Sequence, residues 1–181
     1  MVDELITPTA KLEWAFIIEP VPLDSEYSAG SYNCVVWLKK EDPAAIKFRG
    51  QLDELINLAV VETWGKTPPA KLSIAKILDG DTEGYVNDEG ESVYPNQGSF
   101  GFRVSSKRKP VVVDGHGSPI VDSSLLGYNP RAQIKLRPYS WSFGKSRKGV
   151  SLGLSAAMVV DFGQSTASTA TEGFEFENAS A

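Results

Sequence analysis

Alternation between two kinds of side chain over residues 131–143 is the feature that most restricts how this chain folds. The sequence there is RAQIKLRPYSWSF. Successive side chains on a β-strand point to opposite faces, so residues of the same parity share a face. The even positions from Ile134 to Pro138 are apolar, which suits a core. The odd positions carry two cations and then three aromatic rings: Lys135, Arg137, Tyr139, Trp141 and Phe143.

The odd face of this predicted strand suits neither a core nor an ordinary surface. Burying Lys135 and Arg137 without partners is costly, and three exposed rings leave a large apolar patch against water. Single-stranded nucleic acid satisfies both halves, because cations bind its phosphates and aromatic rings stack on its bases. Pro138 indicates an edge or a bend in the strand. A bulge there would invert the parity and send Trp141 into the core, and this alternative stays open.

Charge is distributed unevenly along the chain. The 181 residues have a net charge of -5, yet residues 103–148 hold ten Lys and Arg against two Asp, a balance of +8. Residues 1–102 are acidic, with a balance of -9, and residues 149–181 carry -4 and no cation. A concentrated basic segment in an acidic protein predicts a face that binds a polyanion.

Two further clusters contribute to this basic segment. The stretch FRVSSKRKP begins at Phe102 and follows Phe100, and these two phenylalanines suit a core or a ligand platform equally well. We interpret its cations as phosphate contacts rather than as a nuclear-localisation run, because they sit at the end of a predicted strand. The cations of the two clusters are Arg103, Lys107, Arg108 and Lys109, and then Lys145, Arg147 and Lys148.

The remaining periodicity predicts a mainly β fold. Period-two patterns predict strands over residues 11–19, 32–40, 99–106, 109–114 and 149–161, with Trp14 and Phe16 directed into the core. Asp42 and Pro43 form a cap and first turn for one helix that ends near Trp64. About five main strands, one helix and no βαβ alternation indicate a small closed or nearly closed β-barrel.

Several kinds of chemistry find no support in the residues. The single histidine, His116, lies in a predicted turn, and the single cysteine, Cys34, lies in an apolar run that predicts a buried thiol. We therefore expect no enzyme, no metal and no cofactor. The stretch DGDTEG, from Asp79, matches the start of an EF-hand loop, but Gly90 replaces the glutamate required at its end, so a solvated acidic loop is expected. No membrane span or signal segment is evident, which predicts a cytoplasmic protein.

The order of these motifs resembles one family. KLEWAFIIEP, WLKK before an Asp-capped helix, LDGD, SSKRKPVVVD, GSPI and a closing Gly-rich strand are similar to bacteriophage single-stranded-DNA-binding proteins with an OB fold, over roughly residues 5–162. The resemblance implies a five-stranded OB-fold-like barrel that binds single-stranded DNA non-specifically in phage replication or recombination, in the host cytoplasm. An RNA-binding module and a non-enzymatic interaction or virion protein with a basic partner-binding face remain alternatives.

The C-terminal segment predicts a second region. Residues 1–162 are expected to form the DNA-binding domain, and residues 163–181 a disordered acidic tail. By the resemblance, such a tail can occupy the DNA groove and contact phage replication or recombination proteins, although this chain ends in NASA without a terminal acidic-aromatic pair. A homo-oligomer is compatible with the sequence. The tail residues in question are Glu172, Phe174, Glu175, Phe176 and Glu177.

Overall fold

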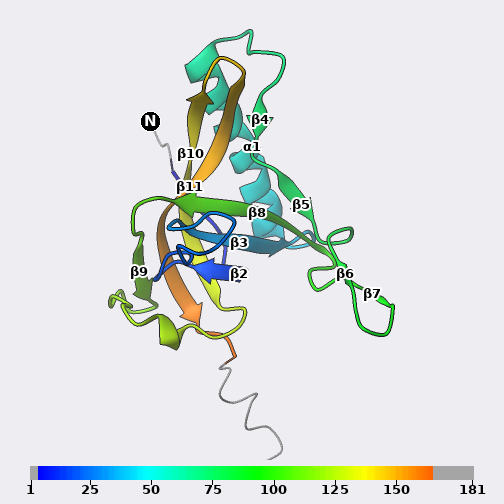
Figure 1. Ribbon diagram of the computed structural model, residues 1–181, viewed down its shortest axis with the longest axis vertical. Helices are drawn as coiled ribbons and strands as arrows, with labels where there is room; N and C mark the ends of the chain where they lie inside the picture. Colours follow the sequence, from blue (N-terminus) through cyan, green and yellow to red (C-terminus); the bar gives the residue numbers. More distant parts are fainter. Residues whose placement is uncertain (1–3, 165–181) are drawn as a thin grey trace, which may run out of the picture.

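The computed structural model describes residues 4–164 and is mainly β with one α-helix among those residues, as predicted (Figure 1). The predicted tail lies outside the described residues, apart from its first two. The strands are β1 (Leu5–Ile6), β2 (Ala10–Phe16), β3 (Tyr32–Lys39), β4 (Ser73–Ile74), β5 (Ile77–Asp79), β6 (Tyr85–Val86), β7 (Ser92–Val93), β8 (Ser99–Ser106), β9 (Val111–Asp114), β10 (Arg131–Phe143) and β11 (Arg147–Asp161). The helix is α1 (Pro43–Trp64), and η1 (Ser123–Leu125) is a short 3-10 turn.

Five strands close into a ring around the core. They pair in the order β10, β2, β3, β8 and β11, and β11 pairs again with β10. The junction between β8 and β11 is one parallel pair, Ser105 with Gly153, and the other four junctions are antiparallel. These five strands correspond to predicted strands, and the further predicted strand at KPVVVD is β9, which pairs with β11 outside the ring. Leu12, Val36 and Phe102 are among the side chains fully buried inside.

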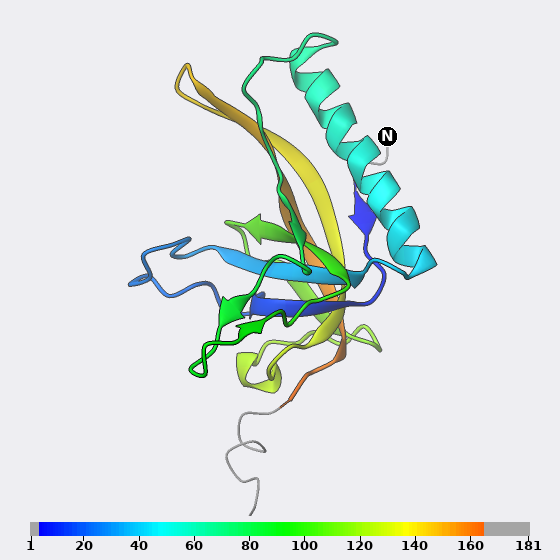
Figure 2. The same cartoon turned by 90° about the vertical axis from the view of Figure 1, so that its right-hand side faces the viewer.

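Helix α1 begins and ends where the sequence predicts. The Asp42 carboxylate accepts the Ala44 N–H at 3.0 Å, Pro43 occupies the first turn, and the Gly65 N–H closes the end on the Val61 carbonyl at 2.8 Å. The helix runs beside the β10–β11 hairpin (Figure 2). At the hairpin, the Thr63 hydroxyl lies 2.7 Å from that of Ser140. The helix therefore covers one face of the hairpin and leaves the other face open.

Strand β10 keeps its parity through Pro138. Ile134 and Leu136 are fully buried, whereas Lys135, Arg137 and Tyr139 are exposed. The two irregularities in this pair lie on β11 instead, where one extra residue stands between the partners of Arg131 and Ala132 and another between those of Lys135 and Leu136. The odd face of β10 is thus turned away from the core along the strand.

The prediction that Trp14 faces the core is wrong. A bulge interrupts the pairing of β2 with β3 between Glu13 and Phe16, and Trp14 there adopts a left-handed backbone with φ 52°. The extra residue inverts the parity, so Trp14 is 74% exposed while Ile17 is fully buried. Phe16, also predicted in the core, is only half-buried.

The inner strands settle two other expectations. Phe100 and Phe102 are buried in the core, so neither is a platform for a ligand. Cys34 is also buried, and this burial raises the pKa of its thiol to about 12. His116 lies in the turn after β9, where its N–H donates to the Asp114 carboxylate at 2.8 Å. Both the buried thiol and the turn histidine were predicted.

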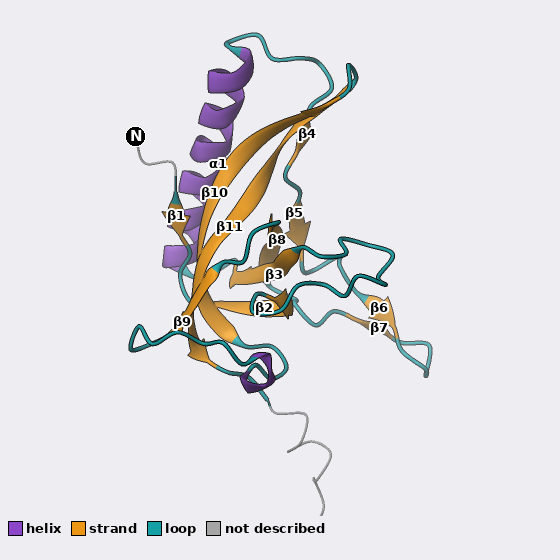
Figure 3. Ribbon diagram, turned by 60° about the vertical axis from the view of Figure 1, so that its left-hand side comes forward, coloured by secondary structure: helices purple, strands orange, loops and turns teal. Residues whose placement is uncertain are grey.

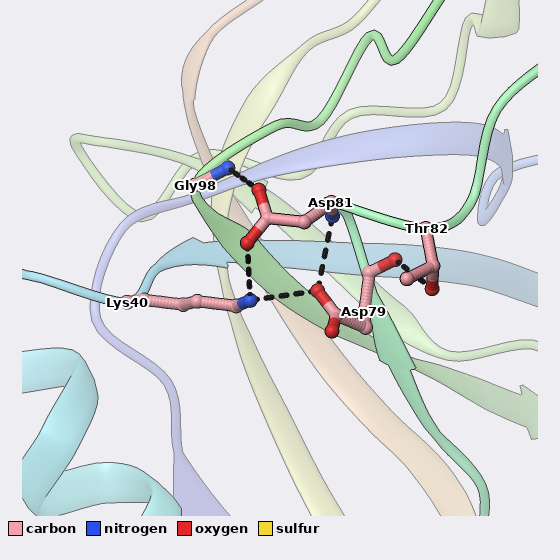
Figure 4. Close-up of polar contacts among 5 residues, drawn as sticks. All are labelled: Lys40, Asp79, Asp81, Thr82 and Gly98. Atoms are coloured by element: carbon pink, nitrogen blue, oxygen red, sulfur yellow. Dashed lines mark hydrogen bonds and ion pairs between the residues drawn. The ribbon is translucent and has the colours of Figure 1, made fainter.

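The acidic loop after β5 is pinned by a lysine. Lys40 lies 2.6 Å from the Asp79 carboxylate and 2.7 Å from that of Asp81, which also accepts the Gly98 N–H (Figure 4). The hydrogen bond from Lys40 lowers the pKa of both carboxyl groups, and those bonds raise the pKa of Lys40. The loop therefore holds a lysine side chain where an EF-hand loop would hold calcium.

Candidate nucleic-acid interface

A groove of about 1080 Å³ crosses the open face of the ring. Its walls are the loop between β2 and β3, the end of β8 with the bend after it, the middle of β10 and the facing part of β11. The odd face of β10 forms part of its floor. The charged and aromatic side chains along it are Arg103, Lys107, Arg108, Lys109, Arg137 and Tyr139.

The described residues that line this groove include five cations and no carboxylate. Arg103 is held in place because its guanidinium donates to the Ser28 hydroxyl at 2.8 Å. The bend that carries Lys107 and Lys109 is fixed at its start by the Arg108 N–H, which donates to the Ser106 hydroxyl at 3.0 Å. Five clustered cations repel one another, so an anion with repeated charges is the ligand that fits. The sequence placed these cations in two separate stretches, and the fold brings them together.

Tyr139 supplies an aromatic surface inside this groove. Its ring lies against Gly153 on β11, where an added Cβ would stand 3.3 Å from ring carbon Cδ1. The absence of a side chain at Gly153 thus lets the ring rest on the strand. Tyr139 remains 42% exposed. A nucleobase can stack on such a supported ring.

Trp141 points away from the core, which answers the question left open by Pro138. Its indole lies over Gly149, where an added Cβ would be 2.7 Å from ring carbon Cζ2. The indole N–H donates to the Ser151 hydroxyl at 3.0 Å. Trp141 is half-buried on the same face as Tyr139. The strand therefore presents two supported rings in succession.

The remaining predicted hairpin residues lie beyond the groove. The β10–β11 hairpin extends past the ring (Figure 2), and Phe143 near its tip is 73% exposed. Lys145 and Arg147 are exposed and Lys148 is half-buried. None of these four residues lines the groove. Phe143 and Arg147 pair with each other and continue the face that carries Trp141, Lys145 lies in the turn between them, and Lys148 pairs with Ser142 on the opposite face.

Lys135 also stands outside the groove. It is exposed on the odd face of β10, and its ammonium lies 3.1 Å from the Glu4 carboxylate. Both side chains are well exposed, so this ion pair stabilises the fold little. Of the twelve predicted contact residues, six line the groove, and the others continue along the strand and hairpin.

A second, smaller groove of about 440 Å³ adjoins the first. Arg103 and Ser105 line both. Ser151, which accepts the Trp141 N–H, lines the second groove as well. The two grooves therefore meet at Arg103 and lead toward Trp141.

Sequence reasoning missed Lys76 and the loop between β2 and β3. Lys76 lines the second groove, and Ser28 to Ser31 line the first. The sequence did carry one signal for the lysine, since Lys66, Lys71 and Lys76 recur every five residues between the helix and β5. Those lysines lie within residues 1–102, and the net negative charge of this segment gave no reason to expect a cationic site there.

Trp14 belongs to a different surface. With Tyr85, Tyr128 and Phe16 it lines an aromatic pocket of about 570 Å³, and Glu13 and Glu19 are the charged groups along it. Trp14, Tyr85 and Tyr128 do not line either basic groove. Carboxylates and the lack of a lining cation make this pocket a poor place for phosphates.

The family comparison fits the two basic grooves. A family model described as Enterobacter phage Enc34, ssDNA-binding protein, matches residues 3–181. The chain belongs to this family. This membership confirms the resemblance seen in the sequence. Comparison with curated protein sequences gives no match.

Members of the Enc34 family and a related phage protein share the fold. The single-stranded DNA-binding protein from bacteriophage Enc34 superposes with a TM-score of 0.68 at 14% identity, over 96% of this chain and 87% of the other. The same protein in complex with ssDNA gives 0.69 at 15% identity, over 91% and 89%. The gp2.5 single-stranded DNA-binding protein of bacteriophage T7 gives 0.58 at 19% identity, over 98% of both chains. At these identities the likeness concerns the fold.

Residues 4–164 contain no helix that is long and apolar enough to cross a membrane. Within that same range, no cluster of three or more His, Cys, Asp or Glu side chains has the arrangement of a metal site.

Proposed function

We propose that this protein binds single-stranded DNA without sequence preference and acts in phage DNA replication or recombination. The observation that carries the proposal is the union of five cations and the Tyr139 ring in one groove. Membership of a family named for ssDNA binding supports the same ligand. Cations on a groove with aromatic rings are the usual means of holding a single strand.

In the proposed mechanism the cationic side chains bind phosphates and the aromatic side chains bind bases. Arg103, Lys107, Arg108, Lys109 and Arg137 neutralise phosphates, which releases condensed counterions and makes the affinity depend on salt. Tyr139 and Trp141 stack on bases, which contributes about 1–3 kcal/mol per base and depends little on sequence. Phe143, Lys145, Arg147 and Lys148 extend the contact along the hairpin, and Lys135 adds a phosphate contact when its pair with Glu4 opens.

The spacing of the rings explains a preference for single strands. Residues two apart on a strand are separated by about 6.6 Å, since a β-strand rises about 3.3 Å per residue. Bases in a duplex are stacked about 3.4 Å apart. Bases that stack on Tyr139 and then on Trp141 must therefore leave their mutual stack, and paired bases resist this separation.

Binding, rather than catalysis, is the proposed activity. The Cys34 thiol is buried with a raised pKa, so it is a poor nucleophile, and His116 sits in a turn outside both grooves. No cofactor or metal is part of the proposal. Replication or recombination proteins are proposed to bind through the tail residues Glu172 to Glu177.

A salt-series titration tests the proposal. Oligo-dT is expected to quench tryptophan fluorescence, and log K is expected to fall linearly with log salt concentration, by roughly 0.7 for each phosphate neutralised. The triple variant K107A/R108A/K109A is expected to lower that slope by about 2. Lys47→Ala, an exposed lysine of α1 that lines neither groove, serves as the control.

The ligands of the same titration separate the alternatives. Duplex DNA of equal length is expected to bind more weakly, and equal affinity would reduce the groove to a plain cationic patch. Tighter binding of oligo-rU than of oligo-dT would favour an RNA-binding module. Saturation without quenching or salt dependence would remove nucleic acid as the ligand.

A further inference from the structure

Strand β4 brings a second cationic segment beside the hairpin. It pairs with β11 in parallel, Ser73 with Gly149 and Ile74 with Val150, and the Ala75 N–H donates to the Val150 carbonyl at 2.9 Å. Figures 1 and 3 show β4 alongside the two long strands. The contact is close, because an added Cβ at Gly149 would lie 2.2 Å from the Ser73 carbonyl oxygen. The segment that follows α1 is therefore held against the hairpin by backbone contacts.

A cation precedes each member of the Ser73–Gly149 pair by the same number of residues. Counting back two residues from the Ser73–Gly149 pair reaches Lys71 on one segment and Arg147 on the other. Both side chains are exposed. Residues at one level of a parallel pair lean to the same face, here the face of Gly149 and Ser151. Two neighbouring cations repel each other, which destabilises the protein when no ligand is bound. An anion bound between them attracts both, and so stabilises the same arrangement.

Lys76 continues the same cationic edge into the second groove. It lines this groove together with Arg103, which also lines the first. Its ammonium forms an ion pair with the Glu83 carboxylate at 3.6 Å, and both side chains are well exposed. Exposed ion pairs of this kind hold weakly. A phosphate can therefore replace Glu83 without a large loss of stability.

Trp141 lies between these two cationic edges. Its indole rests on Gly149, the residue that also meets the Ser73 carbonyl, and its N–H is fixed on Ser151 in the second groove. A base stacked on Trp141 thus has Lys76 and Arg103 on one side and Arg147 farther along. Stacking and phosphate contacts are combined here as they are around Tyr139.

We propose that the segment around β4 forms a second half of the DNA site. A single strand passes from the first groove over Arg103 into the second groove, and then runs across the surface of the paired strands β4 and β11, where Lys71 and Lys76 neutralise phosphates together with Arg147. This inference rests on the proposed function, because it names more of the same DNA path. It predicts that the site has two parts that short and long oligonucleotides distinguish.

The test compares two oligonucleotide lengths. Oligo-dT of about 6 nucleotides lies near the short end of the roughly 4–16 nucleotides that one fold of this kind covers, and oligo-dT of about 20 nucleotides exceeds that range. The K71A/K76A variant is expected to bind the longer oligonucleotide about tenfold more weakly at low salt, with a slope reduced by about 1.4. Its affinity for the shorter oligonucleotide is expected to stay within about twofold of the native value.

A charge-matched variant provides the control. K39A/K47A removes two exposed lysines that line neither groove, and is expected to leave both affinities and the slope unchanged. The K71Q/K76Q variant repeats the test with side chains that keep most of the length of lysine. Thermal melting verifies that each variant is folded.

The outcomes separate this inference from the proposed function. If the native protein binds oligo-dT but K71A/K76A keeps the native slope on the longer oligonucleotide, the second half of the site is rejected and the first groove stands. Equal losses for both lengths also reject it, since the lysines would then act within the first groove. If the native protein binds neither length, the proposed function itself is rejected.

Discussion

Tyr139 rests on Gly153 of the neighbouring strand, and an added Cβ there would stand 3.3 Å from its ring. The same carbon would also stand 3.3 Å from the Arg137 carbonyl oxygen. Both distances are tight, so a larger side chain at Gly153 must push the ring outward. Gly153 is therefore part of the proposed DNA site, although it has no side chain to contact the DNA.

Gly153→Val is therefore expected to weaken ssDNA binding while the fold persists. Valine suits a strand, but its branched side chain displaces the Tyr139 ring from its resting position. We expect a loss of about 1 kcal/mol, the lower end of one stacking contact, measured as quenching by oligo-dT. Gly153→Ala is the milder control, with a smaller loss. Native affinity in the valine variant would show that the position of the ring does not matter.

Tyr139→Ala is expected to weaken binding by about 1–3 kcal/mol, because one stacked base loses its support. Tyr139→Phe keeps the ring and is expected to bind nearly as well as the native protein. The salt slope is expected to stay the same in both, since no phosphate contact is lost. Salt-series titrations of the three proteins measure both quantities. An altered slope in the alanine variant would indicate that the tyrosine orders a cation rather than a base.

The odd face of β10 was predictable because parity is a local property. Alternation over a long strand survives one proline, and buried Ile134 and Leu136 fix which face is inward. Trp14 shows the limit of the same reasoning. A single extra residue in β2 inverted its face, and no feature of KLEWAFIIE marks the bulge, since a tryptophan with φ 52° is uncommon.

The second half of the site was not predictable for a different reason. The proposed DNA path includes Lys71 and Lys76 because β4 pairs with β11, although 72 residues lie between Ile74 and Arg147. Such a short parallel contact leaves no periodic pattern in the sequence. Charge balances over long windows also averaged these lysines with the acidic residues around them. Which strands pair with each other depends on the tertiary fold, and this pairing decides which cations become neighbours.

Asp81→Asn is expected to lower the thermal stability at neutral pH but not in acid. Hydrogen bonds from Lys40 and from the Gly98 N–H hold the pKa of Asp81 below the ordinary aspartate value of 3.8. A lowered carboxyl pKa stabilises the fold above the unfolded value, and the contribution is lost as the pH falls through the folded value. The difference in melting temperature between native and variant is thus expected at about pH 7, and to shrink well below pH 3.8.

Melting curves recorded across this range supply the measurement. Asp88→Asn is the control, because this exposed carboxylate forms no hydrogen bond or ion pair with the residues that the structure describes. It is expected to have little effect at either pH. The raised pKa of Lys40 acts at the other end of the scale, so its contribution is lost as the pH rises above 10.5. A difference that stays constant into acid would mean that Asp81 acts through its shape rather than its charge.

Truncation after Gln164 is expected to raise the affinity for ssDNA. The removed residues 165–181 carry Glu172, Glu175 and Glu177 and no cation, so they can compete with phosphates for the five cations of the groove. The gain is expected to be several-fold at low salt and to shrink as salt screens the charges. The cut preserves the backbone bonds between Tyr128 and Gln164, at 2.7 and 3.1 Å.

Two further proteins identify what the tail contributes. The full chain with E172Q/E175Q/E177Q keeps Phe174 and Phe176, and is expected to reproduce most of the gain if charge is the cause. A cut after Phe162 removes the Tyr128–Gln164 bonds as well, and is expected to lower the melting temperature, which the cut after Gln164 leaves unchanged. Equal affinity of the full chain and the Gln164 truncation at every salt concentration would reject competition by the tail, and would leave protein partners as its proposed ligand.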